Sequence, residues 1–209
     1  MIAILIPARS GSKGVPNKNV KTISGKPLFV WTILAAKKCK LAAKIILSTD
    51  SHDYARLAEM NGCEADLRPH ELSTDDASTI DLVHYYSQKF PQILTWIILQ
   101  PTSPIRPKGL IDSVLDFHYN GGYDNTVTGY FCLAKEFGTH NNLRRQDYTG
   151  FFYDDGSIYV LNKELCEQKK WFGNKIGRFI SPRICQYEID DSVDFEIVEA
   201  LINNYKNEF

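Results

Sequence analysis

The chain has 209 residues, of which 44% are hydrophobic and 23% are charged, and its formal net charge is −1. This composition is typical of a globular protein with one sizeable core, and it excludes a disordered chain. The balance of charges argues against a protein that binds long nucleic acids by bulk electrostatics.

The cysteines and the first apolar run indicate the compartment. The five cysteines are widely spaced and form no C-x-x-C pair, so we expect free thiols in a reducing cytoplasm rather than disulfides or a zinc site. The apolar run at residues 2–6 ends at a proline and is too short for a signal peptide or a membrane span. We therefore expect a cytoplasmic protein with no membrane or nucleic-acid partner.

Strands and helices alternate along most of the chain. Apolar runs predict strands at residues 2–6, 44–48, 64–67, 95–99 and 125–128, and helical patterns cover residues 27–38, 52–61, 79–89, 108–119 and 192–206. This alternation is typical of α/β proteins and predicts a doubly wound, mostly parallel sheet with helices on both faces. In such sheets the ligand binds beyond the carboxyl ends of the strands.

Residues 130–186 break this alternation. Aromatic residues, turns and short strand-like runs such as Phe151–Tyr153 and Gly156–Leu161 crowd together there. We expect one domain over residues 1–209, with an irregular, partly β insertion at about residues 130–175. Such an insertion could close over the site or pair with a second subunit, and exposed aromatics favour an interface. Ordinary core packing of these aromatics is the alternative.

The loop after the first strand has the composition of a phosphate-binding site. Its glycines let the backbone come close to phosphate oxygens, and successive N–H groups form an anion-binding nest. The loop also carries three cations and polar side chains, namely Arg9, Ser12, Lys13, Lys18 and Asn19. A solvated basic loop is the alternative. The spacing matches neither a P-loop nor the G-x-G-x-x-G of a Rossmann dinucleotide site, so both are disfavoured.

A second polar loop leaves the third predicted strand at the same edge. Residues 67–79 contain short polar side chains and lead into a helix whose N-terminus suits a base or a phosphate. On this stretch alone, N-capping by Thr74, Asp75 or Ser78 is the stronger explanation.

Two further segments place polar and charged side chains at the predicted ligand edge. Residues 99–106 present Gln100 and Arg106 on a loop shaped by two prolines, although the prolines also fit a plain tight turn. Glu188 and Asp190 alternate on an extended segment, so both carboxylates face the same side. Such a pair suits Mg²⁺, which binds one or two carboxylates together with phosphate oxygens and water. Interaction with the following helix dipole is the alternative.

Together these segments resemble the acylneuraminate cytidylyltransferase family of CMP-sugar synthetases. The matching motifs keep the family's order over nearly the whole chain. They are Ala8-Arg9-x-x-Ser12-Lys13-Gly14-x-Pro16-x-Lys18-Asn19, Leu47-Ser48-Thr49-Asp50, Leu67-Arg68-Pro69-x-Glu71-Leu72, Leu99-Gln100-Pro101-Thr102-Ser103-Pro104-x-Arg106 and Gly156-x-Ile158-Tyr159-Val160. The resemblance implies the Rossmann-like fold of nucleotide-diphospho-sugar transferases, with a small dimerisation insertion and a homodimeric assembly.

The resemblance also implies a reaction, in which CTP and a 2-keto-3-deoxy sugar acid give a CMP-sugar and pyrophosphate with Mg²⁺ as cofactor. Catalysis would come mainly from positioning and from neutralising charge on phosphate oxygens. By analogy, the catalytic cations are Arg9, Lys13 and Lys18. The residues implied for nucleotide binding are Arg9, Ser12, Lys13, Asn19, Arg68, Ala77 and Thr79. Those implied for the sugar acid are Gln100, Thr102, Ser103, Arg106, Arg145, Tyr153 and Asp155.

Departures from the family pattern bear on the metal and on the acceptor. The family's paired aspartates fall on Glu188 and Asp190, so Asp190 is the firmer metal ligand. Sialic-acid members usually carry an arginine and an asparagine where this chain has Tyr153 and Asp155, and Arg145 is the candidate to supply the missing charge. We expect an acceptor other than ordinary N-acetylneuraminate, such as legionaminic, pseudaminic or another bacterial nonulosonic acid.

Other functions stay open at this point. One alternative is an enzyme that uses another nucleotide such as GTP, or another sugar acid such as Kdo. A glycosyltransferase of the GT-A type would use the two carboxylates as its D-x-D motif, but the cluster of three cations suits a triphosphate better than a nucleotide-sugar diphosphate. A non-catalytic nucleotide-binding protein would bind CTP without releasing pyrophosphate.

Overall fold

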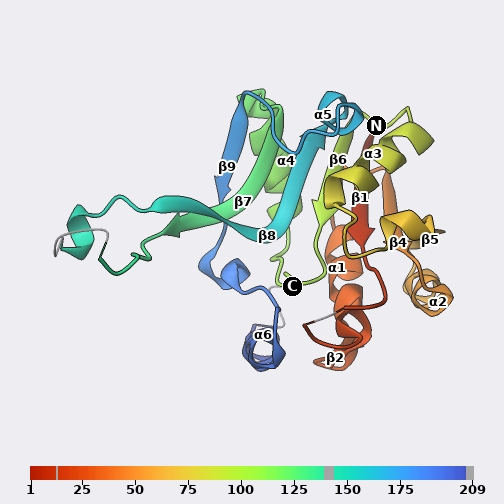
Figure 1. Cartoon of the computed structure of the whole chain (residues 1–209), viewed down its shortest axis with the longest axis horizontal. Coiled ribbons are helices and arrows are strands. Elements are labelled where there is room, and N and C mark those ends of the chain that lie inside the picture. The colour runs from red at the N-terminus through yellow and green to blue at the C-terminus, as the bar shows by residue number, and fades with distance from the viewer. Residues whose placement is uncertain (13, 139–143, 206–209) are drawn as a thin grey trace.

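The computed structural model describes residues 1–12, 14–138 and 144–205, without the side chain of Arg145 (Figure 1). Within these ranges, seven strands form the central sheet in the order β5-β4-β1-β6-β8-β7-β9. Their bounds are β1 Ile2–Pro7, β4 Lys44–Thr49, β5 Glu64–Leu67, β6 Thr95–Leu99, β7 Asn125–Cys132, β8 Phe151–Asn162 and β9 Ile176–Ile180. The pairs are parallel except where β8 meets β6 and β7. The predicted mostly parallel sheet is confirmed.

Helices cover both faces of this sheet, because successive strand residues point to opposite sides. Ile4 and Ile6 of β1 pack with α1, α2 and α4, whereas Ala3 and Leu5 pack with α3 and α5. The helices are α1 Leu28–Ala36, α2 His52–Met60, α3 Thr79–Lys89, α4 Leu110–Gly121, α5 Lys163–Glu167 and α6 Ser192–Asn204. None of the described helices is long and apolar enough to cross a membrane.

Short polar residues and glycines set the helix ends. Ser51 and Ser78 cap α2 and α3, with each side chain accepting a hydrogen bond from a backbone N–H of the first turn. Asp191 and Asp194 form a capping box at the start of α6. Gly122 ends α4 in the left-handed conformation, at a φ of 57°.

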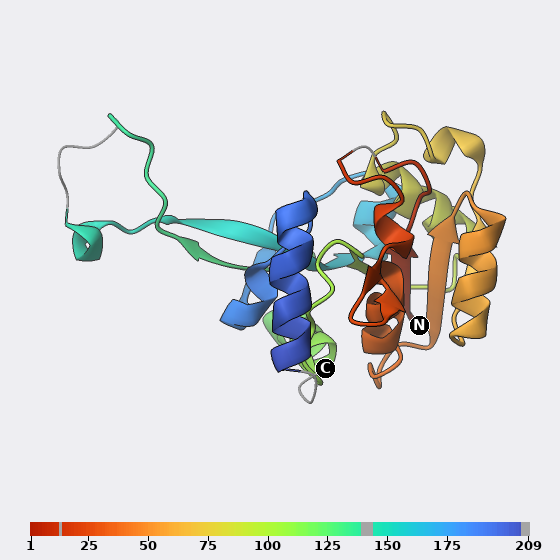
Figure 2. The same ribbon diagram turned by 90° about the horizontal axis from the view of Figure 1, so that it is seen from below.

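A third apolar cluster attaches α6 to the N-terminal half of the chain. Phe195, Val198 and Ile202 of α6 pack against Ile23 and Leu28. These two residues belong to a small hairpin (β2 Thr22–Ile23, β3 Lys26–Pro27) and to the first turn of α1. The sequence reading missed this hairpin. Figure 2 shows α6 next to the point where the β7–β8 hairpin projects from the rest of the molecule. The packing brings the segment before α6 to the loop after β1.

The predicted insertion proves to be two different structures. Residues 156–162 are the second half of β8, which lies inside the sheet between β6 and β7. These residues, expected as a strand-like run of an irregular, partly β insertion, form part of a buried strand within the sheet. Beyond Gly129 and Asp154, the outer parts of β7 and β8 pair as a hairpin that projects from the body (Figures 1 and 2). We call this projection, with the described residues near its tip, the arm.

A wide β-bulge separates the arm from the sheet. The pairing skips from Val127 opposite Tyr159 to Gly129 opposite Asp154. Thr128 fills the gap: its hydroxyl accepts a hydrogen bond from the Ile158 N–H at 3.1 Å and donates one to Asp155 Oδ1 at 2.6 Å. The Thr128 hydroxyl therefore gives the Ile158 N–H a partner where the regular strand pairing is interrupted.

Candidate nucleotide-binding site

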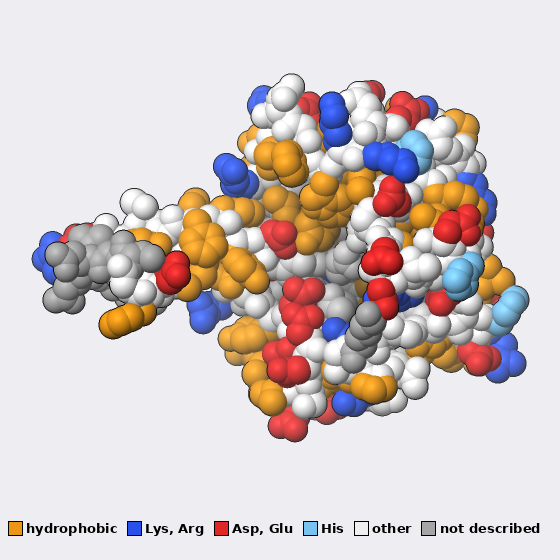
Figure 3. Space-filling view, viewed as in Figure 1, with side chains coloured by type: hydrophobic (Ala, Val, Ile, Leu, Met, Phe, Trp, Pro, Cys, Tyr) orange, Lys and Arg blue, Asp and Glu red, His pale blue; other side chains and the backbone are white. Residues whose placement is uncertain are grey.

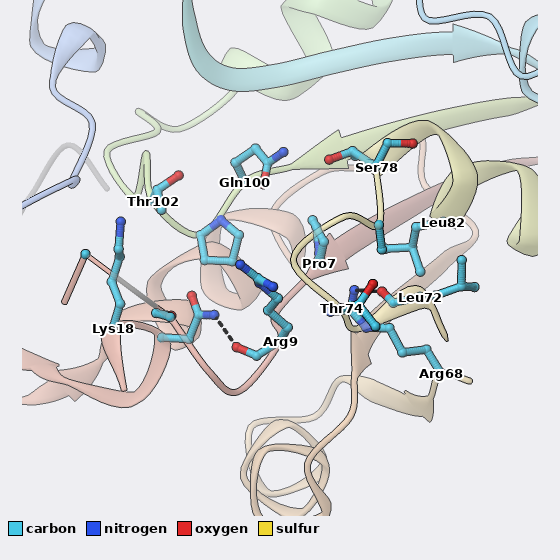
Figure 4. A pocket seen from close by; sticks show the side chains of 16 residues that line it. Pro7, Arg9, Lys18, Arg68, Leu72, Thr74, Ser78, Leu82, Gln100 and Thr102 are labelled. Atoms are coloured by element: carbon cyan, nitrogen blue, oxygen red, sulfur yellow. Dashed lines mark hydrogen bonds between the residues drawn. The ribbon is translucent and has the colours of Figure 1, made fainter. Parts of the chain in front are cut away.

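A cleft of about 360 Å³ lies beyond the carboxyl ends of β1, β5 and β6. Its lining residues are Pro7, Arg9, Ser12, Gly14, Lys18, Asn19, Arg68, Leu72, Thr74, Ala77, Ser78, Thr79, Leu82, Gln100, Pro101 and Thr102. Figure 4 shows Lys18 and Thr102 at one end of the cleft and Arg68, Leu72 and Ser78 at the other, with Arg9 and Pro7 between them. The site lies where the sheet topology predicts it.

The loop after β1 supplies the cations. The Asn19 side-chain amide donates to the Arg9 carbonyl at 2.9 Å, which closes the loop (Figure 4). The Arg9 guanidinium reaches across the cleft and donates to Asp75 Oδ1 at 2.8 Å. The side chain of Lys18 is only 11% exposed and its Nζ donates to the Ile189 carbonyl at 2.6 Å. Both cations are therefore fixed beside the cleft. Lys13 lies outside the described residues.

The opposite end of the cleft combines a buried arginine with the start of α3. Arg68 is 9% exposed, and its guanidinium donates to the carbonyls of Ser48 at 2.9 Å and Leu72 at 3.1 Å. Burial lowers the pKa of Arg68, while Asp50 nearby offsets part of the effect. Ala77 and Thr79 line the cleft here. This end is less charged at its surface and is floored by leucines, which suits a nucleoside.

The residues implied for the sugar acid divide into two groups. Gln100 and Thr102 line the cleft. Ser103 and Arg106 lie beneath the loop and are 1% and 2% exposed. Arg106 donates to the carbonyls of Gln100 and Ser157, both at 2.7 Å, and to the Thr32 hydroxyl at 3.2 Å. Ser103 and Arg106 therefore hold the loop after β6 in place, and their side chains are too buried to contact a sugar in this conformation.

Burial lowers the pKa of Arg106 to about 10, and the nearby carboxylate of Asp155 works in the opposite direction. Arg106 thus stays charged at neutral pH. Asp155 is itself 3% exposed, and its carboxylate accepts hydrogen bonds from Thr128, Ser157 and Ser181. It stabilises the bulge and does not line the cleft. Tyr153 lies on the arm and is 51% exposed. The side chain of Arg145 lies outside the described part of the chain.

Glu188 and Asp190 lie at the Lys18 end of the cleft. The Thr102 hydroxyl donates to Glu188 Oε1 at 2.9 Å, and Lys18 Nζ is 3.5 Å from Asp190 Oδ1. Burial, together with the charges of Asp190 and Asp154, raises the pKa of Glu188, against the opposite effects of Thr102 and Lys18. Capping of the next helix is done by Asp191 and Asp194. The carboxylates of Glu188 and Asp190 are not needed for that purpose.

The described residues contain no group of three or more His, Cys, Asp or Glu side chains placed to hold a metal ion. Glu188 and Asp190 would therefore act as a pair, with the other ligands coming from outside the protein. That donor set fits Mg²⁺, which usually keeps several waters and shares phosphate oxygens with its substrate.

Close backbone approaches at two glycines bring these segments together. A Cβ added to Gly14 would lie 2.8 Å from the Asp190 carbonyl, so the first loop contacts the acidic segment directly. Gly156, at a φ of +65°, faces both carboxylate oxygens of Glu188 and the Ser103 hydroxyl, each 3.0 Å from an added Cβ. The bulge in β8 thus forms one wall beside Glu188.

Several lining residues were not predicted from the sequence. The sequence favours Thr74 and Ser78 as helix caps within a loop whose polar side chains also suit a base or a phosphate, and both residues line the cleft. Leu72 and Leu82 form an apolar floor, and no sequence signal separates such leucines from ordinary core residues. Pro101 lay between two residues that were predicted.

The comparisons with known proteins agree with this geometry. A family model described as Cytidylyltransferase matches residues 3–206. The chain belongs to the cytidylyltransferase family.

Among relatives, N-acylneuraminate cytidylyltransferase from Escherichia coli O18:K1:H7 (strain RS218 / NMEC) is 31% identical over 94% of this chain, which spans only 51% of that protein's length. CMP-N,N'-diacetyllegionaminic acid synthase from Legionella pneumophila subsp. pneumophila (strain Philadelphia 1 / ATCC 33152 / DSM 7513) is 29% identical over 96% of both chains. A solved CMP:2-keto-3-deoxy-manno-octonic acid synthetase complexed with CTP shares the fold, with a TM-score of 0.78 at 17% identity, covering 97% of this chain and 98% of that one.

Replacing Gly156 with alanine tests the wall beside Glu188, and Gly25→Ala is a matched control. Gly25 also has a positive φ, of +81°, but an added Cβ there meets no atom within 4 Å. Both variants should lose about 1–2 kcal/mol of unfolding free energy, because an L-residue is strained in this conformation. Only Gly156→Ala should lengthen the Thr102–Glu188 hydrogen bond in a crystal structure. An unmoved Glu188 in that variant would contradict the close contact.

Proposed function

We propose that this protein transfers a cytidylyl group from CTP to the hydroxyl of a sugar acid. The observation that carries the proposal is the arrangement of one cleft, in which fixed cations lie between a nucleoside-sized end and a pair of carboxylates. The chain's place in the cytidylyltransferase family supports the same reaction class. The acceptor loop with Gln100 and Thr102 lies beside the proposed metal ligands.

In this proposal the triphosphate lies along Arg9, Lys18 and the backbone of the loop after β1. The anomeric hydroxyl of the acceptor attacks the α-phosphorus in line, so a new oxygen–phosphorus bond forms as the bond to the leaving pyrophosphate breaks. The hydroxyl proton passes to solvent. Arg9 and Lys18 stabilise the charge that develops on the leaving group, and the pre-formed loop supplies orientation. Lys13 stays a prediction in the same role.

Glu188 and Asp190 would hold Mg²⁺, which supplies charge neutralisation on the phosphate oxygens when it is bound. Lys18 lies close to Asp190 in the ligand-free protein, and Thr102 fixes Glu188. The longer glutamate is accommodated because Gly156 leaves space for its carboxylate. These contacts support the assignment of both carboxylates to the metal.

We propose a nonulosonic acid as the acceptor, with the legionaminic and pseudaminic acid class ahead of N-acetylneuraminate. The relative from Legionella is named for diacetyllegionaminic acid and matches this chain over almost its whole length. In addition, the Asp155 carboxylate is buried and accepts a hydrogen bond from Thr128 within the bulge, and Tyr153 lies on the arm. Neither residue supplies the amide or the cation that sialic-acid members carry at these positions.

We further propose a homodimer that works in the cytoplasm. The arm exposes Phe131, Phe151 and Tyr153, which are 62%, 49% and 51% exposed. Figure 3 shows hydrophobic side chains gathered on one face of the arm where it leaves the body. Apolar and aromatic surface of this kind favours association. The five cysteines are free thiols, in keeping with a reducing compartment.

A pyrophosphate-release assay tests the reaction. The purified protein should release pyrophosphate from CTP with Mg²⁺ and a legionaminic- or pseudaminic-type acid, and more slowly with N-acetylneuraminate or Kdo. GTP and UTP should give little release. Turnover with GTP alone would overturn the choice of nucleotide. CTP binding without pyrophosphate release, over the whole panel of acids, would support a non-catalytic binding protein instead.

The metal assignment predicts the behaviour of Asp190→Asn. Loss of one carboxylate charge should raise the Mg²⁺ concentration for half-maximal activity by about tenfold, because a charged ligand to the ion is lost. Glu196→Gln removes a nearby exposed carboxylate on α6 and should leave the titration unchanged. The same Mg²⁺ titration curve for Asp190→Asn and the wild type would remove this residue from the metal site.

The oligomer is tested by light scattering coupled to size-exclusion chromatography. The wild type should have twice the mass of the 23.8 kDa chain. Phe131→Lys should shift the protein towards the monomer, since a charge on an apolar interface is unfavourable. Leu94→Lys changes a residue of similar exposure (58%) in the segment before β6 and serves as the control. A monomeric wild type at micromolar concentration would contradict the proposed assembly.

A further inference from the structure

Asp50 lies just outside the cleft and contacts the loop that lines it. It follows β4, and its carboxylate accepts two hydrogen bonds from Ser10, from the backbone N–H at 2.7 Å and from the hydroxyl at 2.8 Å. Ser10 directly follows Arg9 and precedes Ser12, both of which line the cleft. Asp50 therefore holds the middle of the phosphate-binding segment without lining the site.

The strand ends around Asp50 form a fixed platform. The Ala8 N–H donates to the Ser48 carbonyl at 2.8 Å, and the Arg68 N–H donates to the Thr49 carbonyl at 2.8 Å. The Arg68 guanidinium also donates to the Ser48 carbonyl. These bonds tie the ends of β1, β4 and β5 together. A carboxylate attached to this platform has little freedom to move.

The charge of Asp50 is balanced within the protein. Burial raises the pKa of its carboxyl, but the two hydrogen bonds from Ser10 and the nearby Arg68 guanidinium outweigh that effect and hold the pKa below its ordinary value. Asp50 is thus ionised at neutral pH. A negative charge this close to a triphosphate would repel it. The position is therefore unfavourable unless the carboxylate contributes something that offsets the repulsion.

We infer that Asp50 is a positioning residue for the polyphosphate of the nucleotide, acting through Ser10. By taking both donors of Ser10, it turns them away from the ligand and sets the direction of the chain on either side. Gly11 follows at a φ of +49°, in the left-handed region that favours glycine. Arg9 and Ser12 then face the cleft from a loop of fixed shape. The inference rests on the proposed function, because it assigns a phosphate chain to this loop.

The experiment compares the binding of CTP and CMP to the full chain by calorimetry at a fixed Mg²⁺ concentration. Asp50→Asn keeps the shape of the side chain but loses its charge, and it should weaken CTP by about tenfold, as expected for loss of a charge-assisted hydrogen bond. CMP, which lacks the two outer phosphates, should weaken by less than about twofold. Asp53→Asn is the control, since that carboxylate is 85% exposed on α2 and makes only an ion pair with Arg56 at 3.8 Å.

Ser10→Ala gives an independent variant if Asp50→Asn folds poorly. It removes one of the two hydrogen bonds and should weaken CTP by a smaller factor. In the double variant the two effects should not multiply, because both act on the same contact. Equal weakening of CTP and CMP, or multiplicative effects, would overturn the inference.

Unchanged or tighter CTP binding by Asp50→Asn would also overturn the inference. The charge of Asp50 would then do nothing for the triphosphate except repel it. A wild-type protein that does not bind CTP would instead contradict the proposed function itself.

Discussion

Lys18 joins two segments that lie 171 positions apart in the chain, and the geometry of the site depends on this contact. Its ammonium group donates to the Ile189 carbonyl and lies near Asp190, so the loop after β1 and the segment before α6 form one wall. The close approach of Gly14 to the Asp190 carbonyl reinforces this junction. The backbone bond from the Ile189 N–H to the Thr102 carbonyl at 2.8 Å then adds the loop after β6. Three distant parts of the sequence thereby meet within reach of one small ligand.

The same contacts keep the cations in place before any ligand arrives. Arg9 is paired with Asp75, and Lys18 is held by a carbonyl and a carboxylate. A polyanion can replace these partners at little structural cost, because the cations already point towards the cleft. Such preorganisation lowers the entropy lost on binding and concentrates positive potential beside the cleft. In the proposed reaction, the acidic segment next to it would supply the opposite charge that Mg²⁺ requires.

The sequence was most informative where local chemistry decides the structure. The apolar run of β1 and the glycines and cations after it indicated both the strand and its ligand edge, and the boundaries of α3 and β6 match the predicted ranges. The roles of Arg106 and Asp155 could not be read in this way. Arg106 donates to the carbonyls of Gln100, just after β6, and of Ser157 in β8, and Asp155 is buried where β7 and β8 pair through a bulge. Both depend on long-range pairing, which one sequence does not display.

The position of β8 has a consequence for how the chain is made. β6 pairs with β1 on one side. On its other side it pairs with residues 158–162 of β8, which follow some sixty positions later in the chain. During synthesis by the ribosome, β1, β4, β5 and β6 can assemble early, and this growing sheet keeps an open apolar edge until β8 emerges. A nascent chain is therefore exposed to wrong strand pairing over that interval. The step that closes the sheet also completes the bulge, so correct assembly of the core and formation of the wall beside Glu188 happen together.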